Sequence, residues 1–334
     1  MAVRKAANGT QDEAVDHPLE DDAPKDLTAQ DHAQVEEHRN LRPLAVYEVI
    51  RREGVEELRR PVASLWWSGL AAGLSIGFSV VAEGALHAHL PDAPWRPIIE
   101  SIGYSLGFLI VILGRYQLFT EITLTAVLPV LADPTRAALA ALARIWGVVF
   151  AANMVGTAIF AALLSTRVIL PAEIDAGILA LSRELATLTP TDALVRGIVA
   201  GWLIATVAWL LPSAEHSRVI IIVALTGLIS LLQLSHVVSG SVEIFYLTAL
   251  GEIGIGKALG GFILPLLVGN MIGGSALFAL LAYGQVKDEM KDDETASPSA
   301  GSPKPAPGQR GKEKPVLPNP ARKPEKNVSR ETMA

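Results

Sequence analysis

Six apolar segments between residues 61 and 286 constrain this chain more than any other feature of its sequence. They lie at about residues 64–86, 98–131, 140–164, 194–211, 219–250 and 259–283. A helix of about 20 apolar residues crosses a bilayer, and each segment is close to that length or longer. Inside hydrocarbon every backbone polar group needs a partner within the protein, which a helix supplies. The sequence therefore predicts an all-α integral membrane protein with six transmembrane spans.

The distribution of charge divides the chain into four parts. Residues 61–286 hold only 21 of the 62 charged side chains. We expect an acidic, disordered tail over residues 1–42 and a disordered, low-complexity tail over residues 287–334. Between the first tail and the spans, residues 43–60 place apolar side chains at helical spacing among arginines and glutamates. This pattern predicts an amphipathic helix on the cytoplasmic side.

Two of the six segments are too long for one plain span and carry polar residues in the middle. One contains Leu118-Phe119-Thr120 followed by Glu121, and the other contains His236 followed by Gly240 and Glu243. Each is predicted to form two half-helices joined by a break. Lipid does not satisfy polar groups at this depth, so they should face the bundle interior or a water-filled path. His236 is thus a candidate functional centre; the alternative is a histidine that joins two helices through a hydrogen bond.

The two halves of the membrane domain share short motifs in the same order. Asn153-Met154-x-Gly156 matches Asn270-Met271-x-Gly273 at an offset of 117, which also sets Leu118-Phe119-Thr120 opposite Ser235-His236-Val237. The small residues Gly69, Gly73 and Gly77 match Gly197, Gly201 and Ala205 at an offset of 128. Small residues at this spacing let helix backbones approach closely.

Three spans in each half give the second half the opposite orientation in the membrane. The sequence therefore predicts an inverted repeat of 3+3 spans, over about residues 61–165 and 190–286. Broken helices in such repeats meet near the midplane and form the solute site. Half-helix N-termini carry partial positive charge, which suits an anion.

Composition excludes several classes of function. The chain has no cysteine, which excludes disulfides, thiolate metal sites and a cysteine nucleophile. Among the seven histidines only His236 lies at membrane depth, and no nucleophile–base–acid arrangement is evident. We expect no enzyme, no cofactor, no metal site and no nucleic-acid partner. Arginines and lysines near the spans are denser on the side of the two tails, which favours cytoplasmic termini.

The order of spans, the two breaks and the paired motifs at Asn153 and Asn270 resemble the formate/nitrite transporter family over roughly residues 42–285. The stretches 47–54 and 240–243 are similar to its YfdC-type branch. The resemblance implies an aquaporin-like protomer in a homopentamer of the cell (inner) membrane, with one pore per protomer. It also implies passage of a small monovalent anion such as formate or nitrite.

The resemblance also implies roles for individual residues. Leu118, Phe119 and Thr120 would form the first broken-helix loop and border a constriction. His236 would be the central pore histidine, which interacts with the anion or its proton. Arg144 would draw anions in, and the asparagines Asn153 and Asn270 would lie near the two breaks.

Two departures from the family pattern leave alternatives open. Gly240 stands where anion-transporting relatives commonly have asparagine, and Glu121 and Glu243 follow the two breaks. One interpretation joins Arg115, Glu121 and Glu243 in a buried ion-pair network that fastens the breaks. Another keeps the fold but passes a cation, a proton or a neutral solute, with the two glutamates as selectivity groups. A third is a non-conducting membrane scaffold or sensor that acts through its tails.

Overall fold

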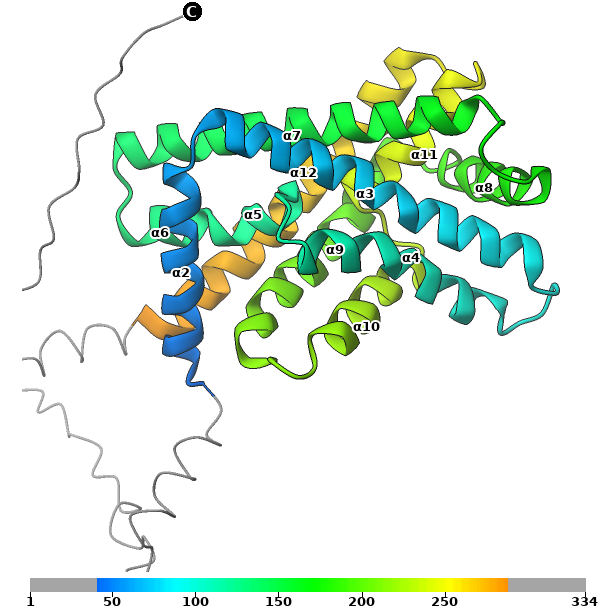
Figure 1. Ribbon diagram of the computed structural model, residues 1–334. Coiled ribbons are helices and arrows are strands. Elements are labelled where there is room, and N and C mark those ends of the chain that lie inside the picture. The colour runs from blue at the N-terminus through cyan, green and yellow to red at the C-terminus, as the bar shows by residue number, and fades with distance from the viewer. Residues whose placement is uncertain (1–40, 288–334) are drawn as a thin grey trace, which may run out of the picture. The chain divides into compact units, whose positions relative to one another are not determined.

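The computed structural model describes residues 41–287 of the chain. Both predicted tails, apart from residues 41–42 and Lys287, lie outside these residues. All the regular structure between residues 41 and 287 is helical, and Figure 1 shows how the helices pack.

The helices follow one another with short connections. In chain order the bounds are α2 Pro43–Arg59, α3 Val62–His89, α4 Arg96–Leu113, α5 Phe119–Thr125, α6 Val127–Ala132, α7 Arg136–Ser165, α8 Ala172–Leu185, α9 Pro190–Leu210, η1 Leu211–Ser213, α10 Arg218–Leu231, α11 Val237–Ala249, η2 Lys257–Ile263, α12 Leu264–Met271 and η3 Ile272–Ala279. The stretches η2 and η3 are π-helical turns in one continuous helix, Lys257–Lys287.

Five helices in the described part of the chain are long and apolar enough to cross a membrane. They are Val62–His89, Arg96–Leu113, Arg136–Ser165, Pro190–Ser213 and Lys257–Lys287. The remaining apolar helices are shorter, namely Phe119–Ala132, Arg218–Leu231 and Val237–Ala249. The two segments predicted to be interrupted are indeed broken, because α4 stops five residues before α5 and α10 stops five residues before α11.

Both breaks begin with the same turn. Arg115 and Gln233 have positive φ values of 53° and 51°. The next amide N–H reaches back to the preceding helix, from Tyr116 to the Val111 carbonyl at 3.0 Å and from Leu234 to the Ile229 carbonyl at 2.8 Å. This left-handed cap satisfies carbonyls that a helix end would otherwise leave open. It also turns the chain out of the helix axis before the next half-helix begins.

The predicted glycine stripes hold two pairs of helices close together. A Cβ atom on Gly73 of α3 would lie 2.3 Å from the Asn153 carbonyl oxygen of α7. A Cβ atom on Gly201 of α9 would lie 2.4 Å from the Asn270 carbonyl oxygen of α12. Only glycine allows these backbones to approach so closely, as the small-residue spacing predicted.

The helices α2 and α8 flank the bundle at opposite ends of α3 and α7 (Figure 1). Gly177 of α8 packs on Gly84 of α3, where an added Cβ would lie 2.4 Å from the Gly84 carbonyl oxygen. We predicted no helix between the third and fourth spans, although Ile174, Ile178 and Leu181 of α8 recur at helical spacing. Burial of this apolar face against the bundle stabilises α8.

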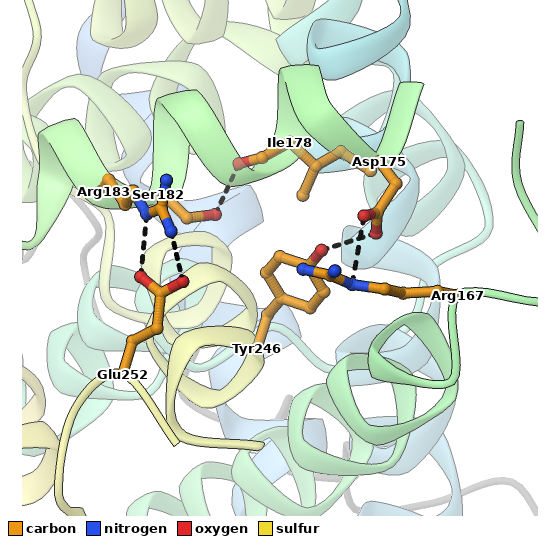
Figure 2. A network of polar contacts seen from close by, with 7 residues as sticks. All are labelled: Arg167, Asp175, Ile178, Ser182, Arg183, Tyr246 and Glu252. Carbon is orange, nitrogen blue, oxygen red and sulfur yellow. Dashed lines mark hydrogen bonds and ion pairs between the residues drawn. The ribbon is translucent and has the colours of Figure 1, made fainter. Parts of the chain in front are cut away.

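Polar contacts fasten α8 to α11 and to the loop that follows α11, as Figure 2 shows. Arg183 of α8 makes a two-pronged ion pair with Glu252, with N···O distances of 2.8 and 2.6 Å. Asp175 of α8 accepts a hydrogen bond from the Tyr246 hydroxyl and pairs with Arg167 at 3.2 Å. These contacts hold α8 in place over the cavity described below.

Candidate solute path between the two breaks

Asn153 of α7 organises the first break. Its Oδ1 accepts a hydrogen bond of 2.9 Å from the Phe119 amide, the first residue of α5. Its Nδ2 donates to the Gly69 carbonyl at 2.7 Å and to the Gln117 carbonyl at 3.0 Å. One buried amide thus joins the break to α3, and it satisfies backbone groups that the missing helical turn leaves open.

Asn270 of α12 does the same at the second break. Its Oδ1 accepts from the Val237 amide at 2.8 Å, and its Nδ2 donates to the Gly197 and Ser235 carbonyls at 2.7 and 3.2 Å. These contacts set Phe119 opposite Val237, at an offset of 118. The motif match in the sequence sets Phe119 opposite His236. That register is wrong by one residue, because the start of the half-helix and its asparagine are one residue closer along the chain in the second half than in the first.

The two breaks touch through Thr120 and His236. The Thr120 Oγ1 lies 2.6 Å from the His236 Nε2, and both side chains are buried. The other ring nitrogen, Nδ1, accepts a hydrogen bond of 3.2 Å from the Ser239 amide and thereby caps α11. Because Nδ1 accepts, the proton of a neutral ring is on Nε2, which donates to Thr120. Phe108 packs edge-on against the imidazole, with ring centroids 5.0 Å apart.

The predicted loop residues Leu118 and Phe119 are fully or almost fully buried. Phe119 stacks edge-on with Phe150 of α7 at 5.1 Å. The amides at the start of α5 and α11 that we expected to face an anion are partly occupied, because Phe119, Val237 and Ser239 donate to side chains of this chain.

A cavity of about 480 Å³ leads from the α8 end of the bundle to His236. Its inner part is bordered by Tyr104, Ser235, His236 and Gly240, and α8 contributes Leu181 and Leu185. We call this cavity the α8 vestibule. The Ser235 Oγ is buried and has no hydrogen-bond partner within residues 41–287. The vestibule therefore reaches the break with polar groups available to a solute.

Glu243 lines the α8 vestibule together with Glu83 of α3. Glu83 accepts a hydrogen bond from the Ser230 hydroxyl of α10, next to the second break. The signal that could have located it is an acidic residue inside an otherwise apolar helix.

The basic residues of the proposed site lie at the α2 end. Arg115 is exposed and its ion-pair partner is Glu53 of α2 at 3.5 Å, rather than Glu121. Within the described residues neither Glu121 nor Glu243 takes part in an ion pair, so the fastening network does not form there. Arg144 donates a hydrogen bond to the Leu58 carbonyl, at the C-terminal end of α2.

Glu57 of α2 reaches the first break from the same side. It accepts hydrogen bonds from Gln117 at 3.2 Å and from Thr125 at 2.8 Å. Burial raises the pKa of this carboxyl group.

The described residues contain no cluster of three or more histidine, aspartate or glutamate side chains that could hold a metal ion.

A family model described as formate/nitrite transporter matches residues 44–284 of this chain. The chain is 39% identical over 255 residues to the inner membrane protein YfdC of Escherichia coli (strain K12). The aligned region covers 76% of this chain and 82% of that protein. These two matches show that the chain belongs to the formate/nitrite transporter family.

Two solved channels share the fold at low sequence identity. A pentameric formate channel with formate bound superposes with a TM-score of 0.58 at 18% identity, over 68% of this chain and 97% of the channel. An ion channel of the same family superposes with a TM-score of 0.63 at 20% identity, over 72% of this chain and 98% of the channel. The chain therefore has the fold of a membrane channel, and the solved relatives are described as channels rather than enzymes.

Proposed function

We propose that this protein is a channel or transporter for a small monovalent weak-acid anion of the formate or nitrite type. The observation that carries the proposal is the meeting of two broken helices at Thr120 and His236, at the inner end of a polar cavity. Family membership supplies the solute class. In this proposal the solute passes between the breaks, and the buried Leu118 and Phe119 make the path narrow and dry.

The same proposal includes six spans arranged as an inverted repeat of 3+3. Its support is the matched set of contacts at Asn153 and Asn270, each of which receives the first amide of a half-helix and donates to two carbonyls. Each broken segment then counts as one span. A homopentamer in the inner membrane completes the proposal, on the strength of the pentameric formate channel and the E. coli relative. Cytoplasmic termini are part of it on the strength of the arginines and lysines near the spans.

His236 is proposed as the group that the solute meets at the constriction. With Nδ1 capping α11, its Nε2–H is a donor that a solute oxygen takes over from Thr120. If the imidazole ring itself carried the proton, Nδ1 would have to be protonated. The hydrogen bond from the Ser239 amide to Nδ1 would then break. Arg144, bound to the end of α2, is proposed to attract anions at that end.

A second candidate function keeps the fold and passes a cation or a proton. The observation that favours it is the acidic lining of the α8 vestibule, where Glu83 and Glu243 both border the path to His236. Glutamine at either position would abolish cation flux, whereas anion flux would survive that change if charge repulsion were the only effect of the glutamates.

Purified protein in liposomes on a solid-supported membrane separates these functions. We would apply concentration jumps of formate, nitrite, acetate and lactate at several pH values, and then of potassium, to the native protein and to His236→Ala. The proposal predicts anion-evoked currents that fall in the variant. Flux and pH dependence that stay intact in His236→Ala would refute the role of the histidine, and potassium current alone would support the cation channel.

A further inference from the structure

The α8 vestibule contains more acidic than basic side chains. Its lining includes the carboxyl groups of Glu83, Glu100, Glu184 and Glu243 and the guanidinium groups of Arg96 and Arg196. His87, His236 and the phenol of Tyr104 are the other titratable groups on the lining. These nine groups come from α3, α4, α8, α9, α11 and the second break, so they represent every face of the cavity. A free anion that enters from this end meets a surface that repels it.

The carboxyl groups of Glu100 and Glu184 are engaged by their neighbours. Glu100 lies 3.1 Å from the Arg96 guanidinium and 2.9 Å from the His87 Nδ1. Glu184 accepts a hydrogen bond of 2.7 Å from the Gln233 side chain, and Arg196 donates to the Gln233 carbonyl at 3.0 Å. These four charged groups are therefore all held by contacts within the protein.

The carboxyl groups of Glu83 and Glu243 have no such compensation. Glu83 accepts one hydrogen bond from the Ser230 hydroxyl, and within residues 41–287 Glu243 has neither an ion pair nor a hydrogen bond. Two carboxylates that share a cavity and have no ion-pair partner repel each other, and a proton bound to one of them removes that repulsion. The pair is thus placed to hold a proton beside the constriction.

His236 is poorly placed to hold this proton. Both ring nitrogens are already engaged, Nε2 with Thr120 and Nδ1 with the Ser239 amide. Protonation of Nδ1 would leave the Ser239 N–H without its acceptor at the start of α11. A proton that accompanies the solute therefore needs a carrier other than the imidazole ring.

An orphaned hydroxyl marks the position where the solute would sit. The Ser235 side chain borders the α8 vestibule beside His236, is only 2% exposed, and its Oγ has no partner in the part of the chain that the structure describes. Buried polar atoms nearly always have a partner, so an unpartnered hydroxyl in a residue that lines the cavity points to a bound molecule. A carboxylic or nitrous acid supplies both the donor and the acceptor that Ser235 and Glu243 require.

We infer that Glu83 and Glu243 carry the proton that accompanies the solute through the α8 vestibule, and that Ser235 holds the solute while it is protonated. This inference rests on the anion transport proposed above. The solute anion forms a new O–H bond with the proton of the Glu243 carboxyl group, whose own O–H bond breaks. Glu243 is left as a carboxylate and regains a proton from the solution in the vestibule by way of Glu83. The solute then passes Thr120 and His236 as a neutral acid.

The test measures anion flux and proton movement in the same liposomes, with a pH-sensitive dye inside and a formate or nitrite gradient across the membrane. The variants are Glu83→Gln, Glu243→Gln and Glu243→Asp, each compared with native protein for folding by gel filtration and melting temperature. Glu173→Gln is the matched control, because Glu173 is an exposed carboxylate on α8 at the same end of the bundle.

The inference predicts that both glutamine variants lose proton-coupled flux by a factor of about ten or more, together with its pH dependence. Glu243→Asp, which keeps the carboxyl group, retains coupling with a shifted pH profile, and Glu173→Gln behaves like native protein. Coupled flux within about twofold of native in both glutamine variants would overturn the inference.

The remaining outcomes separate this inference from the proposed function. Proton movement without any anion flux in the native protein, abolished by Glu243→Gln, would refute the anion function and support the carboxyl groups as proton carriers. Potassium flux that depends on Glu243 would overturn the inference in favour of a cation site. Native liposomes that move neither anion nor proton would refute both.

Discussion

The Oγ1 of Thr120 and the Nε2 of His236 lie 2.6 Å apart, although 116 residues separate them in the chain. The contact joins the two half-helices α5 and α11 at the point where each begins. Because His236 Nδ1 accepts from the Ser239 amide, Thr120 is the acceptor for the second ring nitrogen. This hydrogen bond thus closes the gap between the breaks and fixes the orientation of the imidazole ring.

Thr120→Val removes the hydroxyl group while keeping the shape of the side chain. The His236 N–H then remains buried without an acceptor, which costs about 1–3 kcal/mol. We expect a lower melting temperature in detergent for Thr120→Val and a value near native for Thr120→Ser, which keeps the acceptor. Equal melting temperatures for native protein and the valine variant would show that the hydrogen bond contributes nothing to stability.

Asn153→Asp and Asn270→Asp keep the acceptor for the half-helix amide but lose the two N–H donors. A carboxylate would then face two backbone carbonyl oxygens at each site. We expect each change to destabilise the protein by roughly 2–4 kcal/mol, since two buried hydrogen bonds are lost.

Thr157→Val is the control for the asparagine variants. Thr157 is also buried in α7, but its hydroxyl donates only to the Met154 carbonyl of the same helix. Thermal unfolding followed by tryptophan fluorescence checks both sets. Asparagine variants no less stable than Thr157→Val would contradict the structural role of Asn153 and Asn270.

Gly73→Ala and Gly201→Ala test the close contact between helix backbones. The new Cβ atoms would lie 2.3 and 2.4 Å from carbonyl oxygens, so the helices must separate. We expect a loss of about 1–3 kcal/mol, as for other overpacked sites. Gly147→Ala in α7 is the control, because no atom lies within 4 Å of the added Cβ and alanine favours a helix by up to about 1 kcal/mol. Similar melting temperatures for all three variants would argue against the predicted packing.

The ion pair between Arg183 and Glu252 predicts a pH dependence for α8. The hydrogen bonds from Arg183 hold the pKa of the Glu252 carboxyl group below its usual value. A lowered pKa means that the unfolded state binds the proton more tightly. The stabilisation is therefore complete above the ordinary glutamate pKa of about 4.3 and is lost as the pH falls through the lowered value.

Hydrogen exchange of the α8 amides in Glu252→Gln checks this dependence. We expect faster exchange than in native protein at neutral pH, and a smaller difference both in acid and at high salt, because the pair is exposed and screened. If the exchange rates of Glu252→Gln and native protein differed equally in neutral and in acid solution, the ion pair would be excluded as the cause.

Local sequence patterns located the helices and the breaks because hydrophobic length and polar interruption act at short range. The segments around Leu118 and His236 are interrupted where polar residues enter the apolar runs, and the glycines at 73 and 201 lie in helix contacts. The same reasoning missed α8, although its apolar residues recur at helical spacing; only its contact with Gly84 of α3 depends on the tertiary structure.

Side-chain partners were harder to predict than helices, because a pairing depends on which helices become neighbours. Arg115 is six residues from Glu121, yet its positive φ turns it outward to Glu53 of α2. Glu83 is 147 residues from Ser230, yet α3 brings it to the second break.

The sequence by itself determined that the chain must cross a membrane as helices and that two of those helices must break, because the hydrophobic effect and backbone hydrogen bonding act on each segment alone. Only the tertiary structure decided that Thr120 meets His236 and that Glu83 joins Glu243 in one cavity. Those contacts follow from the packing of glycine-lined helices, which sets distances between residues that no local pattern relates.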